Sequence, residues 1–181
     1  MSGVSVIDTW GSSAAERAAE YPCDGLIERP HVVFRAIDID APSEIVFRWL
    51  CQMRVAPYSY DWIDNLGRRS PRHLVPGLEQ LEIGQQFATI FRLVDFEAGR
   101  SITIASNTAL FGRVAGTYRV DPVDDDRSRL IVKLAFAGRP GCHDRVLRLF
   151  LPAGDLVMMR KQLLTFKALA ERDARNYERS I

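Results

Sequence analysis

The chain has 181 residues, which suits one domain, because two domains of half this length would each have a small core. Hydrophobic residues make up 47% of the chain and charged residues 26%, which argues against intrinsic disorder. The 24 basic and 23 acidic residues leave a formal net charge of +1. This balance excludes a general electrostatic attraction to nucleic acid or to an anionic membrane.

The cysteines and the apolar stretches favour a cytoplasmic protein. Cys23, Cys51 and Cys142 lie far apart without a CxxC pair, so neither a disulfide framework nor a zinc site is expected. Residues 1–10 lack a basic segment followed by an apolar run, so we expect no secretory signal. The most apolar late stretch, 146–159, is interrupted by charged residues, proline and glycine, and we expect no membrane span.

The chain is predicted to begin with an N-terminal extension over residues 1–28, followed by the main domain over residues 29–181. A short helix is expected within 12–20, before Pro22. Residues 31–40 are rich in β-branched and aromatic side chains and predict a strand. Because both faces of this strand are mostly apolar, it should be covered on both sides.

A helix is predicted directly after this strand. Residues 41–44 contain a proline, which fits a first helical turn, and a glutamate, which suits the positive end of the helix dipole. Apolar residues then recur on one face of the expected helix: Ile45, Val46, Trp49, Leu50 and Met53. Pro57 should end it, and a second short helix is expected over 59–66, before Gly67.

Four β-rich runs follow a polar connection at 68–84. They cover residues 85–96, 101–106, 114–121 and 128–137. Turn chemistry at 98–99 and 124–126 separates them, and such close spacing favours an antiparallel meander. The first run is long enough to contain a bend or two strands.

After Gly138 the hydrophobic pattern returns to helical spacing. We expect a short helix over 146–151 that ends at Pro152, and a long helix from Asp155, as N-cap, to about Asn176. The long helix has a continuous apolar seam: Leu156, Met159, Leu163, Phe166 and Ala170. Helices at both ends with strands between them predict an α+β fold, in which this helix fills the concave side of a curved sheet.

Two short motifs and the final helix resemble a known superfamily. The segment IDIDAPSEIVFRWL at 37–50 is similar to the first strand, Ala-Pro turn and first helix of the START / Bet v 1 / polyketide cyclase-like (SRPBCC) superfamily. GQQF at 84–87 is similar to the start of its second strand. Together these matches cover residues 30–175, and PYSYDWIDNLG at 57–67 also resembles an aromatic stretch of some bacterial members.

The resemblance implies a helix-grip (Bet v 1-like) fold, a curved antiparallel sheet wrapped around a long C-terminal helix with an apolar cavity. It implies no reaction, because the superfamily includes lipid carriers, hormone receptors, cyclases and aromatases. We predict a START/Bet v 1-like domain that binds a small hydrophobic or amphipathic molecule of lipid, polyketide or isoprenoid type, without evident catalysis. The alternative is a cyclase/aromatase-type enzyme acting on a polyketide-like substrate in the same cavity. Its candidate residues are Arg35, Tyr60, Asp61 and Tyr118.

Ten residues with polar handles or adaptable apolar side chains form the predicted ligand-binding set: Arg35, Tyr58, Tyr60, Trp62, Thr89, Thr103, Tyr118, Met158, Met159 and Leu163. For the aromatic and methionine residues, a role in core packing is the alternative. Strand alternation places Arg35 with Val33 and Ile37, so it could point into the cavity and meet a carboxylate or carbonyl oxygen. Arg92 and Lys133 also lie in apolar runs. For all three bases an edge position in water is the alternative.

No residue set predicts a catalytic centre, a metal site or a cofactor. His31, His73 and His143 are not spaced with another histidine, cysteine or carboxylate as a metal site requires. The chain has no G-x-S-x-G elbow, Walker loop or G-x-G-x-x-G motif. The expected partner is a small hydrophobic ligand, with no nucleic acid and no membrane span. A homodimer, and a regulatory role in which the 143–151 segment contacts a partner protein or closes the cavity, stay open.

Overall fold

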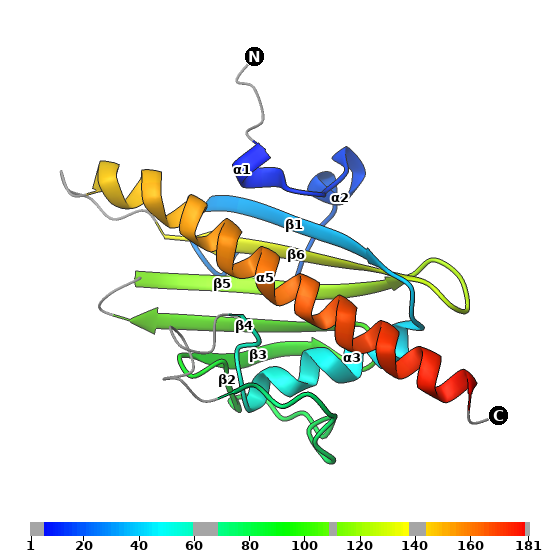
Figure 1. Ribbon diagram of the computed structural model, residues 1–181. Helices are drawn as coiled ribbons and strands as arrows, with labels where there is room; N and C mark the ends of the chain where they lie inside the picture. The colour runs from blue at the N-terminus through cyan, green and yellow to red at the C-terminus, as the bar shows by residue number, and fades with distance from the viewer. Residues whose placement is uncertain (1–5, 60–68, 109–111, 138–143, 180–181) are drawn as a thin grey trace.

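The computed structural model describes residues 6–59, 69–108, 112–137 and 144–179 (Figure 1). In chain order its elements are α1 (Val6–Thr9), α2 (Ala14–Ala18), β1 (His31–Ile39), α3 (Ser43–Cys51), the 3-10 turn η1 (Gln52–Arg54), β2 (Gln86–Phe87), β3 (Phe91–Glu97), β4 (Ser101–Thr108), β5 (Gly112–Pro122), β6 (Ser128–Phe136) and α5 (Asp144–Glu178). This order of helices and strands confirms the predicted α+β class.

The strands form one curved antiparallel sheet in the order β1-β6-β5-β4-β3-β2. Strands β2 to β6 are the predicted meander, and the run at 85–96 divides into β2 and β3. α5 runs diagonally across one face of the sheet, and α3 lies beside the C-terminal half of α5 (Figure 1). This is the helix-grip arrangement. Among the described residues, no helix is both long and apolar enough to cross a bilayer.

α5 corrects the predicted division of the last segment into two helices. It is continuous from Asp144 to Glu178, so Pro152 does not end a helix and Asp155 is not an N-cap. A proline inside a helix costs about 3 kcal/mol, which tertiary packing of a long helix can outweigh. The second helix predicted over 59–66 lies, apart from Ser59, outside the described residues.

Strand alternation separates two cores, one on each face of the sheet. Val33 and Ile39 of β1 pack with the residues of α3 and α5, and we call this side the inner face. Phe34 and Ala36 of the same strand point the other way, toward the outer face. Both faces of β1 are therefore covered, as its apolar pattern predicted.

The outer face is covered by the N-terminal segment. Three buried residues of this segment, Tyr21, Cys23 and Ile27, pack against the outer-face side chains of β1, β5 and β6. Nearer the start, Ala36 N donates to Trp10 O at the free edge of β1. Gly11 has φ +73°, and a Cβ there would lie 2.1 Å from Ala36 O, so only glycine fits this contact. The division of the chain at residue 28 stays a prediction.

A buried threonine pair attaches this segment to the sheet. Cys23 N donates to Thr117 Oγ1 at 3.1 Å, and the Thr103 and Thr117 hydroxyls are hydrogen bonded at 2.9 Å. Thr117→Val is expected to lower the free energy of unfolding by about 1–3 kcal/mol, because it leaves two buried polar groups unsatisfied. Urea denaturation measures the change. Thr89→Val, at an exposed position, is the matched control, and an equal effect of both substitutions would contradict this account.

An ion-pair cluster attaches α2 to the sheet. Arg129 of β6 donates to Glu16 Oε1 at 2.8 Å, to Asp38 Oδ1 at 3.0 Å and to Gly11 O at 2.6 Å. Burial alone would raise the pKa of Glu16, but the hydrogen bonds from Arg129 and from Ser13 N lower it below its ordinary value of 4.5.

A lowered carboxyl pKa stabilises the folded chain above the ordinary pKa, and this stability is lost as pH falls through the folded value. Glu16→Gln is therefore expected to cost roughly 1–2 kcal/mol at pH 7 and almost nothing once the carboxyl group of the parent chain is protonated. Urea denaturation from pH 3 to pH 7 checks this. A cost that does not change with pH would show that charge is not its source.

Candidate functional site

One row of residues crosses the inner face from β1 to β5. Arg35 of β1 pairs with Val132 of β6, and Val132 pairs with Tyr118 of β5. Residues in register point to the same side of a sheet, so Arg35 and Tyr118 flank Val132 on the inner face. Two strand spacings separate their backbones by roughly 10 Å, a gap that two long side chains can span. We call these three residues the inner-face row.

Arg35 places a cation in the interior. Its side chain is fully buried, and its Nη1 donates to Phe34 O at 2.8 Å. A guanidinium stays charged in proteins and carries five N–H donors in a planar fork. Such a group can hold an oxygen atom inside an otherwise apolar interior.

Tyr118 belongs to a buried hydrogen-bond chain that joins the sheet to α5. Its hydroxyl donates to Gln162 Oε1 at 2.9 Å and lies 3.6 Å from Met159 Sδ. Gln162 Nε2 donates to Pro57 O at 2.5 Å and lies 3.6 Å from Met53 Sδ. These hydrogen bonds therefore connect β5, α5 and the segment after η1 through groups that are almost fully buried.

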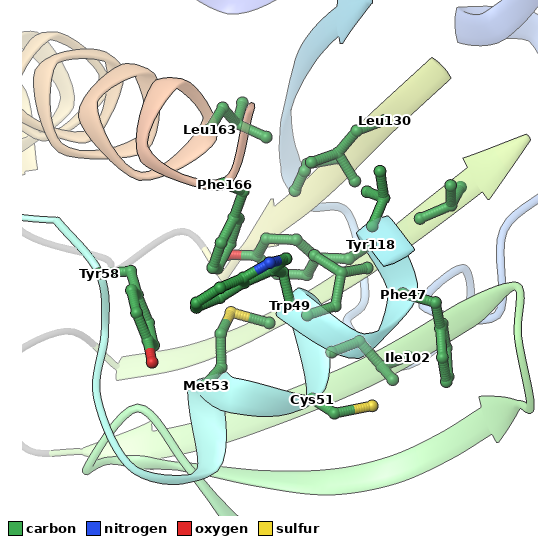
Figure 2. Close-up of a cluster of buried hydrophobic side chains, with 14 of the residues drawn as sticks. Phe47, Trp49, Cys51, Met53, Tyr58, Ile102, Tyr118, Leu130, Leu163 and Phe166 are labelled. Carbon is green, nitrogen blue, oxygen red and sulfur yellow. The ribbon is translucent and has the colours of Figure 1, made fainter. Parts of the chain in front are cut away.

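Apolar and aromatic side chains surround the hydrogen-bond chain of Tyr118 and Gln162. The ring centroids of Trp49 and Tyr58 lie 5.9 Å apart, edge to face, and those of Tyr58 and Phe166 lie 5.5 Å apart. Figure 2 shows these rings with Met53 and Leu163 between α3, α5 and the sheet. An apolar lining with a few fixed polar groups is typical of small-molecule sites.

Tyr58 has an unusual backbone conformation. Its φ is +58°, although it is a bulky residue and only 1% exposed. Non-glycine residues in the left-handed region are strained and persist where packing holds them, often at functional sites. Trp49 and Phe166 provide that packing here.

Four of the ten predicted ligand-binding residues belong to one buried cluster, namely Tyr58, Tyr118, Met159 and Leu163, and a fifth, Arg35, is buried in the same row of the sheet as Tyr118. Met158 is partly exposed beside Met159. Tyr60 and Trp62, like Asp61, lie outside the described residues.

Thr103 and Thr89 lie elsewhere. Ile102 and Ile104 occupy the inner face of β4, so Thr103 between them points to the outer face, where it bonds Thr117. Thr89 is exposed in the turn between β2 and β3. These two threonines therefore do not belong to the candidate site.

Lys133 and Arg92, the other two basic residues in apolar runs, also lie away from the site. Lys133 lies on the outer face, where it pairs with Asp24 at 2.5 Å and stands 5.1 Å from the Tyr21 ring centroid. Arg92 is exposed and donates to Gly84 O. Arg35 is therefore the base, among the three, that reaches the inner face.

Gln162 was missed by the sequence analysis. It lies within the apolar seam of α5, next to Leu163, and was not among the candidate residues. The available signal was its spacing of three residues from Met159 and four from Phe166, which places it near the seam.

The chemistry of the described site is hydrogen bonding. Its buried polar side chains include the guanidinium of Arg35, the phenols of Tyr58 and Tyr118 and the amide of Gln162. Burial raises the pKa of the Cys51 thiol to about 12, so this thiol stays protonated and is a poor nucleophile. Within the described ranges, no group of three His, Cys, Asp or Glu residues could hold a metal ion, and His31 and His73 are exposed.

No protein-family model matches the chain, and no curated protein is similar to it in sequence. Several solved structures, in contrast, have a fold similar to that of this chain. The Zhui aromatase/cyclase from Streptomyces sp. R1128 matches with a TM-score of 0.54 and 19% identity over 80% of this chain and 95% of its own. Protein MLL2253 from Mesorhizobium loti matches with a TM-score of 0.53 and 16% identity over 78% and 98%.

The di-domain ARO/CYC BexL from the BE-7585A biosynthetic pathway matches with a TM-score of 0.51 and 14% identity over 78% of this chain and 46% of its own. At these identities the likeness establishes the fold. The chain has the helix-grip fold of the START / Bet v 1 / polyketide cyclase-like superfamily, which confirms the resemblance at the level of the fold.

Proposed function

We propose that the chain binds a small hydrophobic or amphipathic molecule, of lipid, polyketide or isoprenoid type, between the inner face and α5, without catalysing its conversion. The observation that carries this proposal is the inner-face row: Arg35 and Tyr118 are buried on one side of the sheet inside an apolar and aromatic lining. Two buried polar side chains of this kind, placed in one row within an apolar lining, suit recognition of a polar atom on an apolar ligand.

In this proposal the ligand lies with its apolar body against Met53, Leu163 and Phe166. Burying apolar surface contributes about 25 cal/mol per Å², so the lining supplies most of the affinity. An oxygen atom of the ligand lies over Val132, within reach of Arg35. A hydrogen bond to a charged group contributes roughly 1.5–3 kcal/mol, so the row supplies orientation and selectivity.

Native mass spectrometry of freshly purified protein tests this proposal, followed by solvent extraction and identification of any bound compound. A retained apolar compound at a fixed ratio to protein is the expected result, and it would also give the chemical class. Protein that carries no compound, and that takes up none from a panel of fatty acids, isoprenoid alcohols and aromatic polyketides, would contradict it.

A second candidate function is that of a cyclase or aromatase. It is favoured by the likeness of the fold to the Zhui and BexL aromatase/cyclases. Arg35 and Tyr118 would then orient a reactive chain, together with Tyr60 and Asp61. Incubation with a linear poly-β-ketone thioester separates the two functions, since an enzyme changes the product distribution and a binder only slows spontaneous cyclisation.

The proposal also covers the domain bounds, the cellular location and the partners of the protein. The ligand-binding domain would be residues 29–181, with residues 1–28 as an extension, and the protein would act in the cytoplasm. The expected partner is the small ligand, and a homodimer stays an open alternative.

A further inference from the structure

A short exposed link, residues 28–30, joins β1 to the N-terminal segment, residues 7–27, that covers the outer face. We propose that this segment can leave its own chain and cover the outer face of a second copy, so that two chains form a dimer by reciprocal exchange. The surface involved is the outer face, so the exchange is independent of ligand binding on the inner face.

The link is strained at Arg29. Its φ is +47°, in the left-handed region that residues other than glycine rarely adopt. Pro30 follows it, and the residue before a proline normally has an extended backbone. Arg29 is therefore held by the contacts on its two sides, where Ile27 is buried on the outer face and His31 begins β1. An extended link would relieve the strain, but it would direct the segment away from its own outer face. Short links under strain favour exchange between copies.

The N-terminal segment holds its shape through hydrogen bonds within itself. Ser13 and Glu16 form the capping box of α2. The Tyr21 hydroxyl donates to Glu16 O at 2.9 Å, and Tyr21 N donates to Asp24 Oδ2 at 3.0 Å. Since these bonds do not involve the sheet, the segment can move from one chain to another as a folded unit.

The outer face requires a cover. Phe34 and Ile131 pack under the segment and would be exposed to water if it left, which costs free energy. The face also recognises the segment by charge, because Arg129 pairs with Glu16 at 2.8 Å. A second copy carries the same segment and restores all of these contacts, while both links lose their strain. The dimer is therefore favoured at high protein concentration, by mass action.

Refolding from urea at low and at high protein concentration, followed by size-exclusion chromatography with light scattering, tests the exchange. The wild-type chain is expected to form a dimer whose fraction rises with concentration. Arg29→Gly should raise the dimer dissociation constant by at least about tenfold, because glycine adopts a positive φ without strain and the closed monomer is then favoured. Arg72→Gly is the matched control, at an exposed position where φ is not positive, and should leave the constant unchanged.

NMR of a dimer refolded from an equal mixture of isotope-labelled and unlabelled chains shows whose segment covers each face. The rings of Tyr21 and Phe34 lie edge to face with centroids 5.9 Å apart. Exchange predicts a nuclear Overhauser effect between Tyr21 of a labelled chain and Phe34 of an unlabelled one. The inference would be overturned by a wild-type chain that stays monomeric, by a dimer in which this contact stays within one chain, or by an unchanged dissociation constant in Arg29→Gly.

Discussion

Replacing Trp49 by alanine is expected to lower the free energy of unfolding by about 3–5 kcal/mol, the usual cost of removing a large buried aromatic side chain. Trp49 is fully buried on α3, packs edge to face on Tyr58, and donates from Nε1 to Asp173 Oδ2 at 3.0 Å. It therefore joins α3 to α5 through both packing and a hydrogen bond. The loss should appear as a lower denaturation midpoint in urea.

Two further substitutions separate these contributions. Trp49→Phe keeps an aromatic ring but removes the N–H donor, and Asp173→Ala removes the acceptor and should cost about 1–3 kcal/mol by leaving the indole N–H unsatisfied. Tyr177→Ala, at a position of α5 that is 68% exposed, is the control and should change stability by less than about 0.5 kcal/mol. A cost below about 1 kcal/mol for Trp49→Ala would contradict the packing of α3 described here.

Replacing Arg35 by methionine is expected to weaken binding of an oxygen-bearing probe by about tenfold or more, because a charge-assisted hydrogen bond is lost. The effect should depend on the probe. 2-Methoxynaphthalene offers an oxygen to Arg35, whereas 2-ethylnaphthalene has nearly the same shape and offers none. Only the first should lose affinity when Arg35 is replaced, and isothermal titration of both chains with both probes measures the difference.

Arg92→Met is the control for this experiment, since Arg92 is an exposed arginine on β3. It should leave both affinities unchanged. Urea denaturation of the Arg35→Met chain shows whether it keeps its fold. An equal loss of affinity for the two probes would mean that Arg35 supports the fold and does not contact the ligand oxygen.

Most of the fold could be predicted because its signals are local. The alternation over residues 31–40 gave β1 with both faces covered, and the apolar stripe after residue 41 gave α3. The packing of the N-terminal segment on the outer face could not be predicted. Tyr21 and Cys23 are isolated apolar residues in a segment without helical or strand periodicity, so nothing local indicates that they reach a strand far along the chain.

The candidate site was predicted one residue at a time but not as an arrangement. Arg35 and Tyr118 were both candidates, yet their common row depends on the register of β1 with β6 and of β6 with β5. That register is set by long-range pairing, which the local pattern does not contain. Thr103, a candidate for which an outward-facing position was the alternative, lies on the outer face, and this too follows from strand register, because a shift of one residue reverses the face to which a side chain points.

Methionine-methyl NMR during a titration with 2-naphthol tests most directly whether the ligand lies between the inner face and α5. Met53 and Met159 are buried on either side of the Tyr118–Gln162 chain, and their methyl groups should feel the ring current of an aromatic probe. The account predicts that both methyl resonances, assigned by Met53→Leu and Met159→Leu, shift together and saturate at one probe per chain. Saturable binding that leaves both resonances in place would contradict it, since the ligand would then lie elsewhere on the protein.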